Sequence, residues 1–279
     1  MTKDKNINTF VVKDFGDEWR TFNQESLTGN ALLAAADEYF HLFPFDRLKY
    51  ATGFDMGCGS GRWAKVVAPQ VHSLTCIDPS SIALEQARRN LKGVPNCTFE
   101  CASVEGTSLK DNSQDFGYCL GVLHHVPDTA SGLKECVKKL KEEGVFLLYL
   151  YYRFDNKPTW FRFIWKVSDW GRRGISKLPF RLKLCISQIG AAFVYWPLAR
   201  TSLLLEKFGM NVLNIPLSNY RNKSFYFMRT DALDRFGTKL EHRFTKEEIR
   251  KMMIDAGLKD IRFSTRPPFW VALGIKATR

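Results

Sequence analysis

A run of glycines behind an acidic residue is the first group in the chain whose types and spacing indicate chemistry. The acid, Asp55, lies near the end of a predicted strand over Tyr50–Met56, and a helix is predicted over Arg62–Ala68. Between them the loop has glycine at every second position, with a cysteine and a serine in between: Gly57, Cys58, Gly59, Ser60 and Gly61. Because glycine has no side chain, a ligand can lie against this backbone, and the N–H groups that open the helix can face its polar atoms. For the loop taken alone, a tight turn without a ligand is the alternative.

A second acidic residue, Asp78, follows the next predicted strand, Val71–Ile77, and lies 17 residues after Gly61. At this spacing an α/β fold places a carboxylate on a ribose diol, whose two hydroxyls donate to the two carboxylate oxygens. Pro79 ends the strand, and one of the two serines behind it is predicted to cap the next helix. An acid that only caps this helix is the alternative, but the order strand, glycine loop, helix, strand, acid favours a nucleoside site.

Two adjacent histidines, His124 and His125, stand at the mouth of the predicted fourth strand. A histidine titrates near neutral pH, so either one is a candidate base that removes a proton from an acceptor. We favour His125 slightly, and a histidine that only fixes the loop is the alternative for each. Further polar side chains lie at the end of the predicted fifth strand, Val145–Tyr151, where they could orient an acceptor or, for Tyr152, take part in catalysis: Tyr149, Tyr151, Tyr152 and Arg153.

The glycine loop resembles motif I of the class I S-adenosylmethionine (SAM)-dependent methyltransferases, (D/E)-x-G-x-G-x-G, and differs from the dinucleotide fingerprint G-x-G-x-x-G. Residues Asp115–Asp128, with the sequence DFGYCLGVLHHVPD, closely resemble the fourth strand and following loop of the methyltransferase type 11 group, which includes quinone C-methyltransferases. The run FGDEW, Phe15–Trp19, resembles the N-terminal cover ahead of motif I in several small-molecule methyltransferases, with packing on the sheet as the alternative. The resemblance covers residues ~10 to 152 and resumes near Arg243.

This resemblance implies SAM as the cofactor, with S-adenosylhomocysteine (SAH) as its product, and no metal ion. It also implies an α/β fold: a seven-stranded, mostly parallel Rossmann-like sheet with helices on both faces and an antiparallel last strand. The cofactor-binding residues that it implies are Asp55, Gly57, Cys58, Gly59, Gly61, Asp78, Pro79, Ser103, Val104 and Gly121. Two positions depart from the family: Ser103 stands where an Asp often accepts from the adenine amino group, and Glu142-Glu143-Gly144 replaces a Pro-Gly-Gly turn. Gly144 is still expected to supply the positive φ before the fifth strand.

The bulk composition indicates a globular protein. The 279 residues are 45% hydrophobic and 25% charged, enough to bury a sizeable core. Residues 1–10 lack an apolar secretory core, and the most apolar stretch, Leu184–Leu205, contains Pro197 and Arg200, which favours buried or interfacial helices over a spanning helix. Seven cysteines without paired spacing predict reduced thiols and a cytoplasmic location.

The net charge of +12 is concentrated in one segment, because residues 152–243 hold 17 Lys and Arg against 6 Asp and Glu. Such an excess predicts an anionic acceptor, an anionic membrane surface or nucleic acid, with a solvated basic face as the alternative. We expect a SAM-binding domain over 1–151 and 241–279, with residues 1–45 as a helical lid. The remainder, 152–240, is predicted to be a mainly helical insertion that caps the acceptor pocket. Its candidate acceptor contacts are Tyr220, Arg221 and Tyr226.

The residues and the resemblance together predict a SAM-dependent methyltransferase. Its acceptor is expected to be small or medium-sized, anionic or carried on a sugar or lipid, and deprotonated by a histidine. The alternatives are an RNA methyltransferase and a non-catalytic SAM-binding regulatory or partner protein. No separate RNA-binding module is visible, which argues against nucleic acid. Residues Trp160–Lys166 mix aromatic and basic side chains as interfacial helices do, so a peripheral membrane contact stays open.

Overall fold

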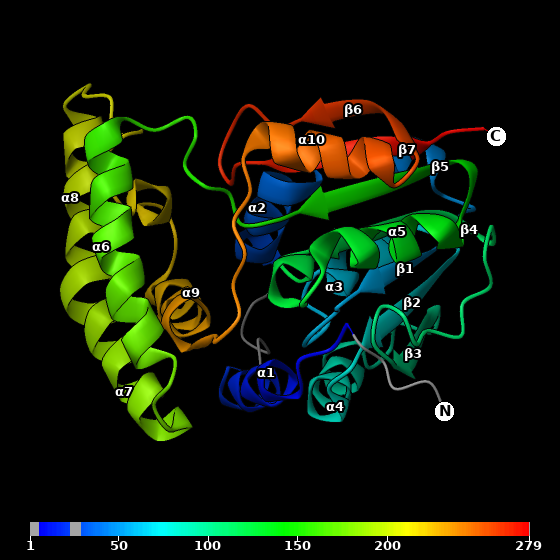
Figure 1. The fold of residues 1–279 in the computed structure, drawn as a ribbon, viewed down its shortest axis with the longest axis horizontal. Helices are drawn as coiled ribbons and strands as arrows, with labels where there is room; N and C mark the ends of the chain where they lie inside the picture. Colours follow the sequence, from blue (N-terminus) through cyan, green and yellow to red (C-terminus); the bar gives the residue numbers. More distant parts are fainter. Residues whose placement is uncertain (1–5, 23–28, 279) are drawn as a thin grey trace. The chain divides into compact units, whose positions relative to one another are not determined.

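The computed structural model describes residues 6–22 and 29–278. The predicted N-terminal lid, 1–45, therefore lies partly outside the described residues, at 1–5 and 23–28. The chain divides into two compact units: residues 1–153 with 240–279, here called the sheet unit, and residues 154–239, here called the helical unit (Figure 1).

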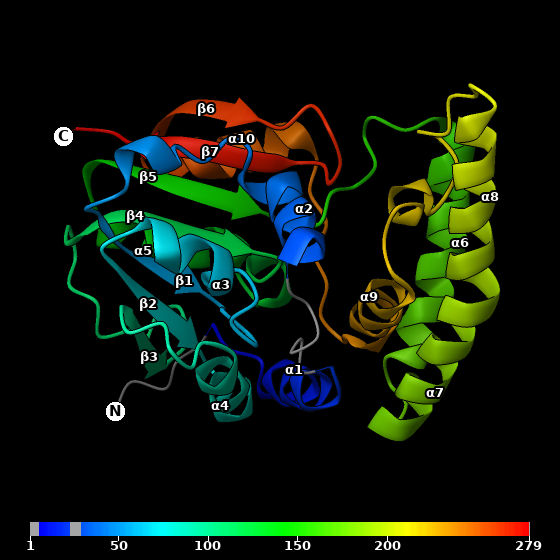
Figure 2. The same cartoon turned by 180° about the vertical axis from the view of Figure 1, so that it is seen from behind.

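A seven-stranded sheet with the order β3-β2-β1-β4-β5-β7-β6 forms the centre of the sheet unit (Figures 1 and 2). Five strands run parallel: β1 (Thr52–Met56), β2 (Ser73–Asp78), β3 (Cys97–Cys101), β4 (Gln114–Leu120) and β5 (Leu140–Tyr149). The last strand, β7 (Val271–Lys276), lies between β5 and β6 (Leu258–Phe263) and is antiparallel to both. The predicted mostly parallel sheet with an antiparallel last strand is thereby confirmed.

Helices cover both faces of this sheet. Figures 1 and 2 show α5 (Thr129–Lys139) and α10 (Lys246–Asp255) over one face, and α2 (Gly29–Phe40) and α3 (Ala64–Val67) over the other. The remaining two, α1 (Thr9–Thr21) and α4 (Ser81–Asn90), pack against each other. Capping side chains set two of the starts, because Ser80 accepts from the backbone of Ala83 and Thr245 forms a capping box with Glu248.

The core of the sheet depends on a reciprocal fit between β1 and β4. Their register places Gly53 opposite Phe116 and Phe54 opposite Gly117, and both phenylalanines are fully buried. A Cβ added to either glycine would lie 2.4 Å from the ring of the phenylalanine opposite. Each ring therefore covers the glycine of the neighbouring strand, and only glycine leaves room for it.

One sequence expectation about β5 is wrong. The strand begins at Leu140 rather than at Val145, and the positive φ falls on Glu143 (61°), not on Gly144. A Cβ at Gly144 would lie 2.9 Å from the carbonyl oxygen of Lys141. Gly144 is thus required by the close approach of two backbone segments and not by a left-handed conformation.

Four helices build the helical unit: α6 (Thr159–Ile175), α7 (Phe180–Gly190), α8 (Trp196–Lys207) and α9 (Phe225–Gly237). A π-helical turn, Ala191–Tyr195, joins α7 and α8 into one continuous segment, where the sequence predicts a break before Pro197. Proline cannot donate to the carbonyl four residues before it, and the π turn is where the hydrogen-bond ladder adjusts to that gap. The α9 helix packs against both α6 and α7. A small core of residues from the π turn, α8 and α9 contains Ala191, Tyr195, Ala199, Met228 and Ala232.

The reciprocal fit of β1 and β4 predicts the effect of one added methyl group. Gly117→Ala should lower the free energy of unfolding by about 1–3 kcal/mol, because the Phe54 ring must leave its place in a packed core. Urea denaturation followed by circular dichroism measures the change. The matched control is Gly190→Ala, in a helical conformation (φ −58°, ψ −42°) with open space at the Cβ position, which should be neutral or stabilising. An unchanged midpoint for Gly117→Ala would refute the packing account.

Candidate functional site

Backbone hydrogen bonds tie the glycine loop to the end of β2. The N–H groups of Gly57 and Cys58 both donate to the carbonyl oxygen of Ile77, at 2.8 and 3.0 Å. The next one, of Gly59, donates to Oδ2 of Asp78 at 2.9 Å. These three loop N–H groups therefore hold the loop in place.

The three loop glycines meet three different neighbours. Gly57 has φ 78°, and a Cβ there would lie 2.4 Å from the side chain of Val122. A Cβ at Gly59 would lie 2.9 Å from the indole of Trp19, and one at Gly61 would lie 3.0 Å from Leu91 on the segment that ends α4. Of the three glycines, only Gly57 lines the cavity at the carboxyl ends of β1, β2 and β4. The other two allow α1 and α4 to pack against the loop.

Asp55 lies in the core and not in the cavity wall. It is paired in register with Cys76 on β2 and Tyr118 on β4, and it is almost completely buried. Burial raises the pKa of its carboxyl group well above the ordinary value, which favours the neutral acid. The structure therefore does not place Asp55 where the resemblance implies a ligand contact.

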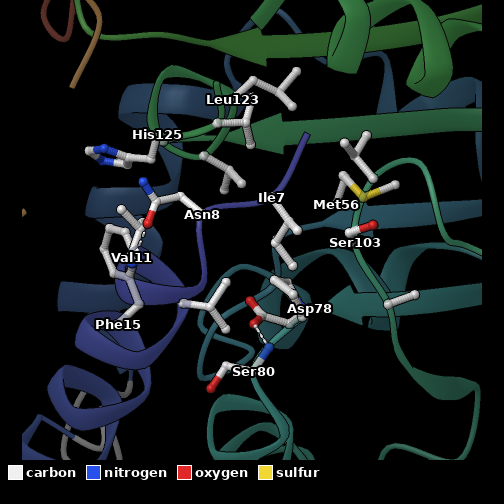
Figure 3. Close-up of a pocket in the computed structure, with 18 of the residues that line it drawn as sticks. Ile7, Asn8, Val11, Phe15, Met56, Asp78, Ser80, Ser103, Leu123 and His125 are labelled. Atoms are coloured by element: carbon white, nitrogen blue, oxygen red, sulfur yellow. Dashed lines mark hydrogen bonds between the residues drawn. The ribbon is translucent and has the colours of Figure 1, made fainter. Parts of the chain in front are cut away.

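A cavity opens at the carboxyl ends of β1, β2 and β4, beside α1 (Figure 3). The space inside the cavity and its open mouth amounts to about 980 Å³. Seven of the residues predicted to act in the site line it: Gly57, Asp78, Pro79, Ser103, Val104, Gly121 and His125. Asp55, Gly59 and Gly61 do not line the cavity. Six further predicted residues of the sheet unit also lie outside its lining: Cys58, His124, Tyr149, Tyr151, Tyr152 and Arg153.

Asp78 accepts hydrogen bonds from two backbone segments of the cavity wall. Its Oδ1 accepts from the backbone N–H of Ser80 at 2.8 Å, and its Oδ2 accepts from that of Gly59. Burial raises the pKa of this carboxyl group to about 6, although the two N–H donors favour the charged form. Each carboxylate oxygen has a second lone pair, so both can still accept from a ligand diol.

The N-terminal segment covers one side of the cavity. Asn8 caps α1 by accepting from the backbone of Phe10 and Val11, and Asn6 exchanges two hydrogen bonds with the backbone of Asp128, at 2.9 and 2.7 Å. The aromatic residues Phe15 and Trp19 line the cavity, as do several residues before them that the sequence reading missed: Asn6, Ile7, Asn8, Val11 and Val12. An Asn directly before an apolar helix is the capping signal that would have drawn attention to this segment.

The two histidines have different surroundings. His125, on a 3₁₀ turn (Leu123–His125), lines the cavity, and its Nδ1 lies 2.7 Å from the carbonyl oxygen of Leu240. A carbonyl only accepts, so Nδ1 carries the proton and Nε2 is the basic nitrogen. His124 is fully buried and stacks on Tyr151, and burial lowers its pKa well below the ordinary value. In Figure 3 His125 and Ser103 lie at opposite ends of the labelled group, with Asn8, Ile7 and Asp78 between them.

The other predicted contact residues make structural interactions. At the end of β5, Tyr152 bridges to Phe244, and Arg153 pairs with Glu248 at 3.0 Å. In the helical unit, Tyr220 packs on Tyr195 with 5.3 Å between ring centroids, and Arg221 binds both oxygens of Glu206 at 2.7 Å. Tyr226 lies in the first turn of α9. Their contacts with an acceptor stay predictions.

The described cysteines form no disulfide. All seven cysteines are free thiols. Among residues 6–22 and 29–278, no three His, Cys, Asp or Glu side chains are grouped so that they could hold a metal ion.

SAM fits the residues that line this cavity. A buried carboxylate at the end of β2 suits a ribose diol, and apolar side chains such as Met56 and Leu123 suit an adenine ring. The guanidinium of Arg62, which lies 4.2 Å over the ring of Trp63, is the only permanent cation among the described lining residues and suits a carboxylate.

Comparisons with known proteins agree with this geometry. Residues 54–148 match the family model of the methyltransferase domain Methyltransf_11. An uncharacterized methyltransferase, YcgJ of Bacillus subtilis, is 31% identical over 100 residues, which are 35% of this chain and 40% of the relative. A ubiquinone biosynthesis O-methyltransferase of Neisseria meningitidis is 33% identical over 95 residues, 33% of this chain and 40% of the relative. The chain thus spans less than half the length of these relatives.

Two solved structures share the fold over almost the whole chain. One is a chain from the complex between the Haloferax volcanii Trm112 methyltransferase activator and a methyltransferase, with a TM-score of 0.53, 13% identity, and coverage of 94% of this chain and 98% of that chain. The other is a SAM-dependent methyltransferase of Thermotoga maritima, with a TM-score of 0.51, 16% identity, and coverage of 96% and 100%. Residues 54–148 thus match a methyltransferase domain, and the sheet that contains them has the class I, Rossmann-like methyltransferase fold.

Proposed function

We propose that the protein transfers a methyl group from SAM to a small or medium-sized acceptor and releases SAH. The observation that carries this proposal is Asp78, a carboxylate in the cavity wall at the end of β2, bound to the glycine loop of a methyltransferase domain. When bound, SAM supplies an electrophilic methyl group on a sulfonium ion, which needs no metal for activation. The chain's own residues then have three tasks: to hold the cofactor, to exclude water and to remove a proton from the acceptor.

Three polar side chains of the cavity each bind a different part of the cofactor. Asp78 accepts from the ribose hydroxyls, and Arg62 pairs with the carboxylate of the methionine part. Ser103, beside Met56 in Figure 3, contacts the adenine edge. On the N-terminal side, Phe15 and Trp19 on α1 exclude water from the cavity.

His125 serves as the base. It lines the cavity, and its Nδ1–H bond to the carbonyl of Leu240 fixes the tautomer in which Nε2 accepts a proton. His124 is excluded from this role because it is fully buried and lies outside the lining. The similar ubiquinone biosynthesis O-methyltransferase points to a hydroxyl acceptor, which must lose its proton during transfer.

Three finer points rest on the sequence alone: the anionic, sugar-linked or lipid-linked nature of the acceptor, its contacts with the helical unit, and the cytoplasmic location. The basic excess of residues 152–243 supports the first.

Asp78→Asn should weaken SAH binding roughly tenfold or more at neutral pH, because the diol loses a charged acceptor. Isothermal calorimetry measures the affinity. In the wild type, affinity should be highest above pH 6 and fall as the pH is lowered through about 6, because Asp78 binds a proton there and the diol favours the ionised carboxylate. The Asp78→Asn variant should lack this fall, and His125→Gln should keep it. An affinity that stays constant down to about pH 5 would contradict the assignment.

Arg62→Gln should weaken binding of SAH roughly tenfold and leave binding of 5′-methylthioadenosine unchanged, because only SAH carries the carboxylate. The same calorimetric titrations, run with both ligands, measure the difference. Asp78→Asn serves as the matched control, since it should weaken both ligands, which share the ribose. Equal losses for the two ligands in Arg62→Gln would place its guanidinium elsewhere.

His125→Gln should lower methyl transfer from labelled SAM to components of a cell extract by at least ~10²-fold, with SAH affinity unchanged. The matched control is His72→Gln, an exposed histidine outside the cavity, which should transfer like the wild type. Transfer at the wild-type rate by His125→Gln would remove the base from the proposal. A wild type that binds SAH tightly and transfers to nothing would favour the non-catalytic alternative.

A further inference from the structure

The α6 helix exposes its most apolar side. Trp160, Phe163, Ile164, Val167 and Trp170 are all exposed, Trp170 by 82%, and their spacing places them on one helical face, here called the α6 stripe. A helix of a soluble protein normally turns such a face to the core. The opposite side is the packed one, and it mixes two half-buried aromatic residues, Phe161 and Trp165, with polar side chains.

On the opposite side of α6, a buried ion pair connects the helix to the residues that follow α9. Arg172 is 6% exposed and pairs with Asp169 at 2.7 Å, and its guanidinium donates to the carbonyl oxygen of Thr238, just after α9, at 3.0 Å. The α6 helix therefore buries an ion pair, whereas five of its large apolar side chains, those of the α6 stripe, are exposed.

The α7 helix repeats the same arrangement. Leu182, Ile186, Ile189 and Phe193 are exposed at helical spacing, Phe193 by 77%, and form the α7 stripe. On the other side, the buried Lys183 donates from Nζ to the carbonyl oxygen of Gly237 at 2.9 Å. Since α6 and α7 both pack on α9 and the side chains of both stripes are exposed, the two stripes face away from α9, and both views show α6 and α7 on the same side of that helix (Figures 1 and 2).

Basic residues accompany the stripes. Residues 154–239 hold 15 Lys and Arg against 5 Asp and Glu, whereas the rest of the chain holds 26 against 24. Along α6, Arg162, Lys166 and Arg173 follow a line beside the apolar stripe, and Lys177 and Arg181 lie between α6 and α7. Within the described part of the chain, the side chains of Lys166, Lys177 and Arg181 have no ion-pair partner.

We infer that the helical unit binds the surface of an anionic phospholipid bilayer through the α6 and α7 stripes. Aromatic and aliphatic side chains on one face of a helix enter the headgroup boundary, and adjacent lysines and arginines attract anionic lipid. The basic charge of the helical unit favours an anionic bilayer over two other partners. A second copy of the chain would bring two strongly basic surfaces together, and a nucleic acid would leave the aliphatic side chains without a partner.

Surface binding also fits better than crossing. Among the described residues, the helical segment Phe180–Lys207 is long and apolar enough to span a membrane by length and composition. Its inner side, however, carries Lys183 and Arg200, and the guanidinium of Arg200 donates to the carbonyl oxygens of Arg221 and Lys223. A spanning helix would take both charges into hydrocarbon, whereas a helix lying at the surface keeps them packed on protein.

Co-sedimentation of the full chain with lipid vesicles tests the inference. The wild type should bind vesicles of phosphatidylcholine mixed with phosphatidylglycerol, bind pure phosphatidylcholine weakly, and be released by salt. The double variant Trp170→Ser with Phe193→Ser should lower the binding constant roughly tenfold or more, and Lys177→Glu with Arg181→Glu should remove the preference for the anionic lipid. All these side chains are exposed, so each variant should keep the circular dichroism spectrum of the wild type.

The matched control is Tyr50→Ser, because Tyr50 is 81% exposed but belongs to the sheet unit, and this variant should bind vesicles like the wild type. Binding that ignores anionic lipid, or that survives both double variants, overturns the inference. A dimer in light scattering that dissociates on Trp170→Ser would show that a second copy covers the stripes. Retention of the protein in natural membranes through an alkaline carbonate wash would show a spanning helix instead.

Discussion

The carboxylate of Asp78 is the constraint on which the site depends. Its two oxygens accept from the backbone of Ser80, at the start of α4, and of Gly59, in the glycine loop. One side chain thereby fixes the end of β2, the loop after β1 and the entry into α4. The two bonds also hold a charged group in a buried place where desolvation opposes the charge and raises its pKa to about 6. The same carboxylate thus connects three segments of the fold and lies in the cavity wall, where we propose that it binds the ribose.

The sheet makes this arrangement possible by a second, purely steric device. The rings of Phe54 and Phe116 lie over Gly117 and Gly53 on the neighbouring strand, so β1 and β4 approach without a gap in the core. The ends of these strands carry Gly57 and Gly121, both with positive φ and both in the cavity wall. The same two strands, β1 and β4, therefore provide both the tight packing inside the sheet and the glycine backbone that lines the cavity.

The helical unit follows a different rule from the sheet unit. In the sheet unit most large apolar side chains lie in the core. In α6 and α7 the buried positions include Arg172 and Lys183, each bonded to a backbone carbonyl, and the side chains of the two stripes are exposed. Charges that lie inside are stabilised by these bonds, and exposed apolar side chains are stabilised only when something covers them. This contrast separates the part of the chain that contains the cavity from the part that exposes the two stripes.

Much of the fold and part of the site could be read from local patterns. The glycine spacing, the acid after the second strand, the His pair after the fourth and the capping box at Thr245 are all local signals, and the sheet they predict is the one observed. The helical unit was predicted less well, because Pro197 reads as a break, although a π turn carries the helix through it. Local sequence propensity cannot predict such a π turn, because the turn depends on the packing of Ala191 and Tyr195 against α9.

What the sequence by itself determined is the order of elements and the types of side chain at the strand ends, because glycine, proline and alternating apolar residues act on the nearest few residues. What only the tertiary structure decided is which of those side chains reach the cavity. Asp55 and His124 have the right type and position in the chain, yet both are buried beside it, whereas Asn6 and Arg62 line it without a motif to announce them. Burial and direction depend on partners distant in the chain, such as Tyr118 for Asp55 and Tyr151 for His124, and no local pattern encodes those contacts.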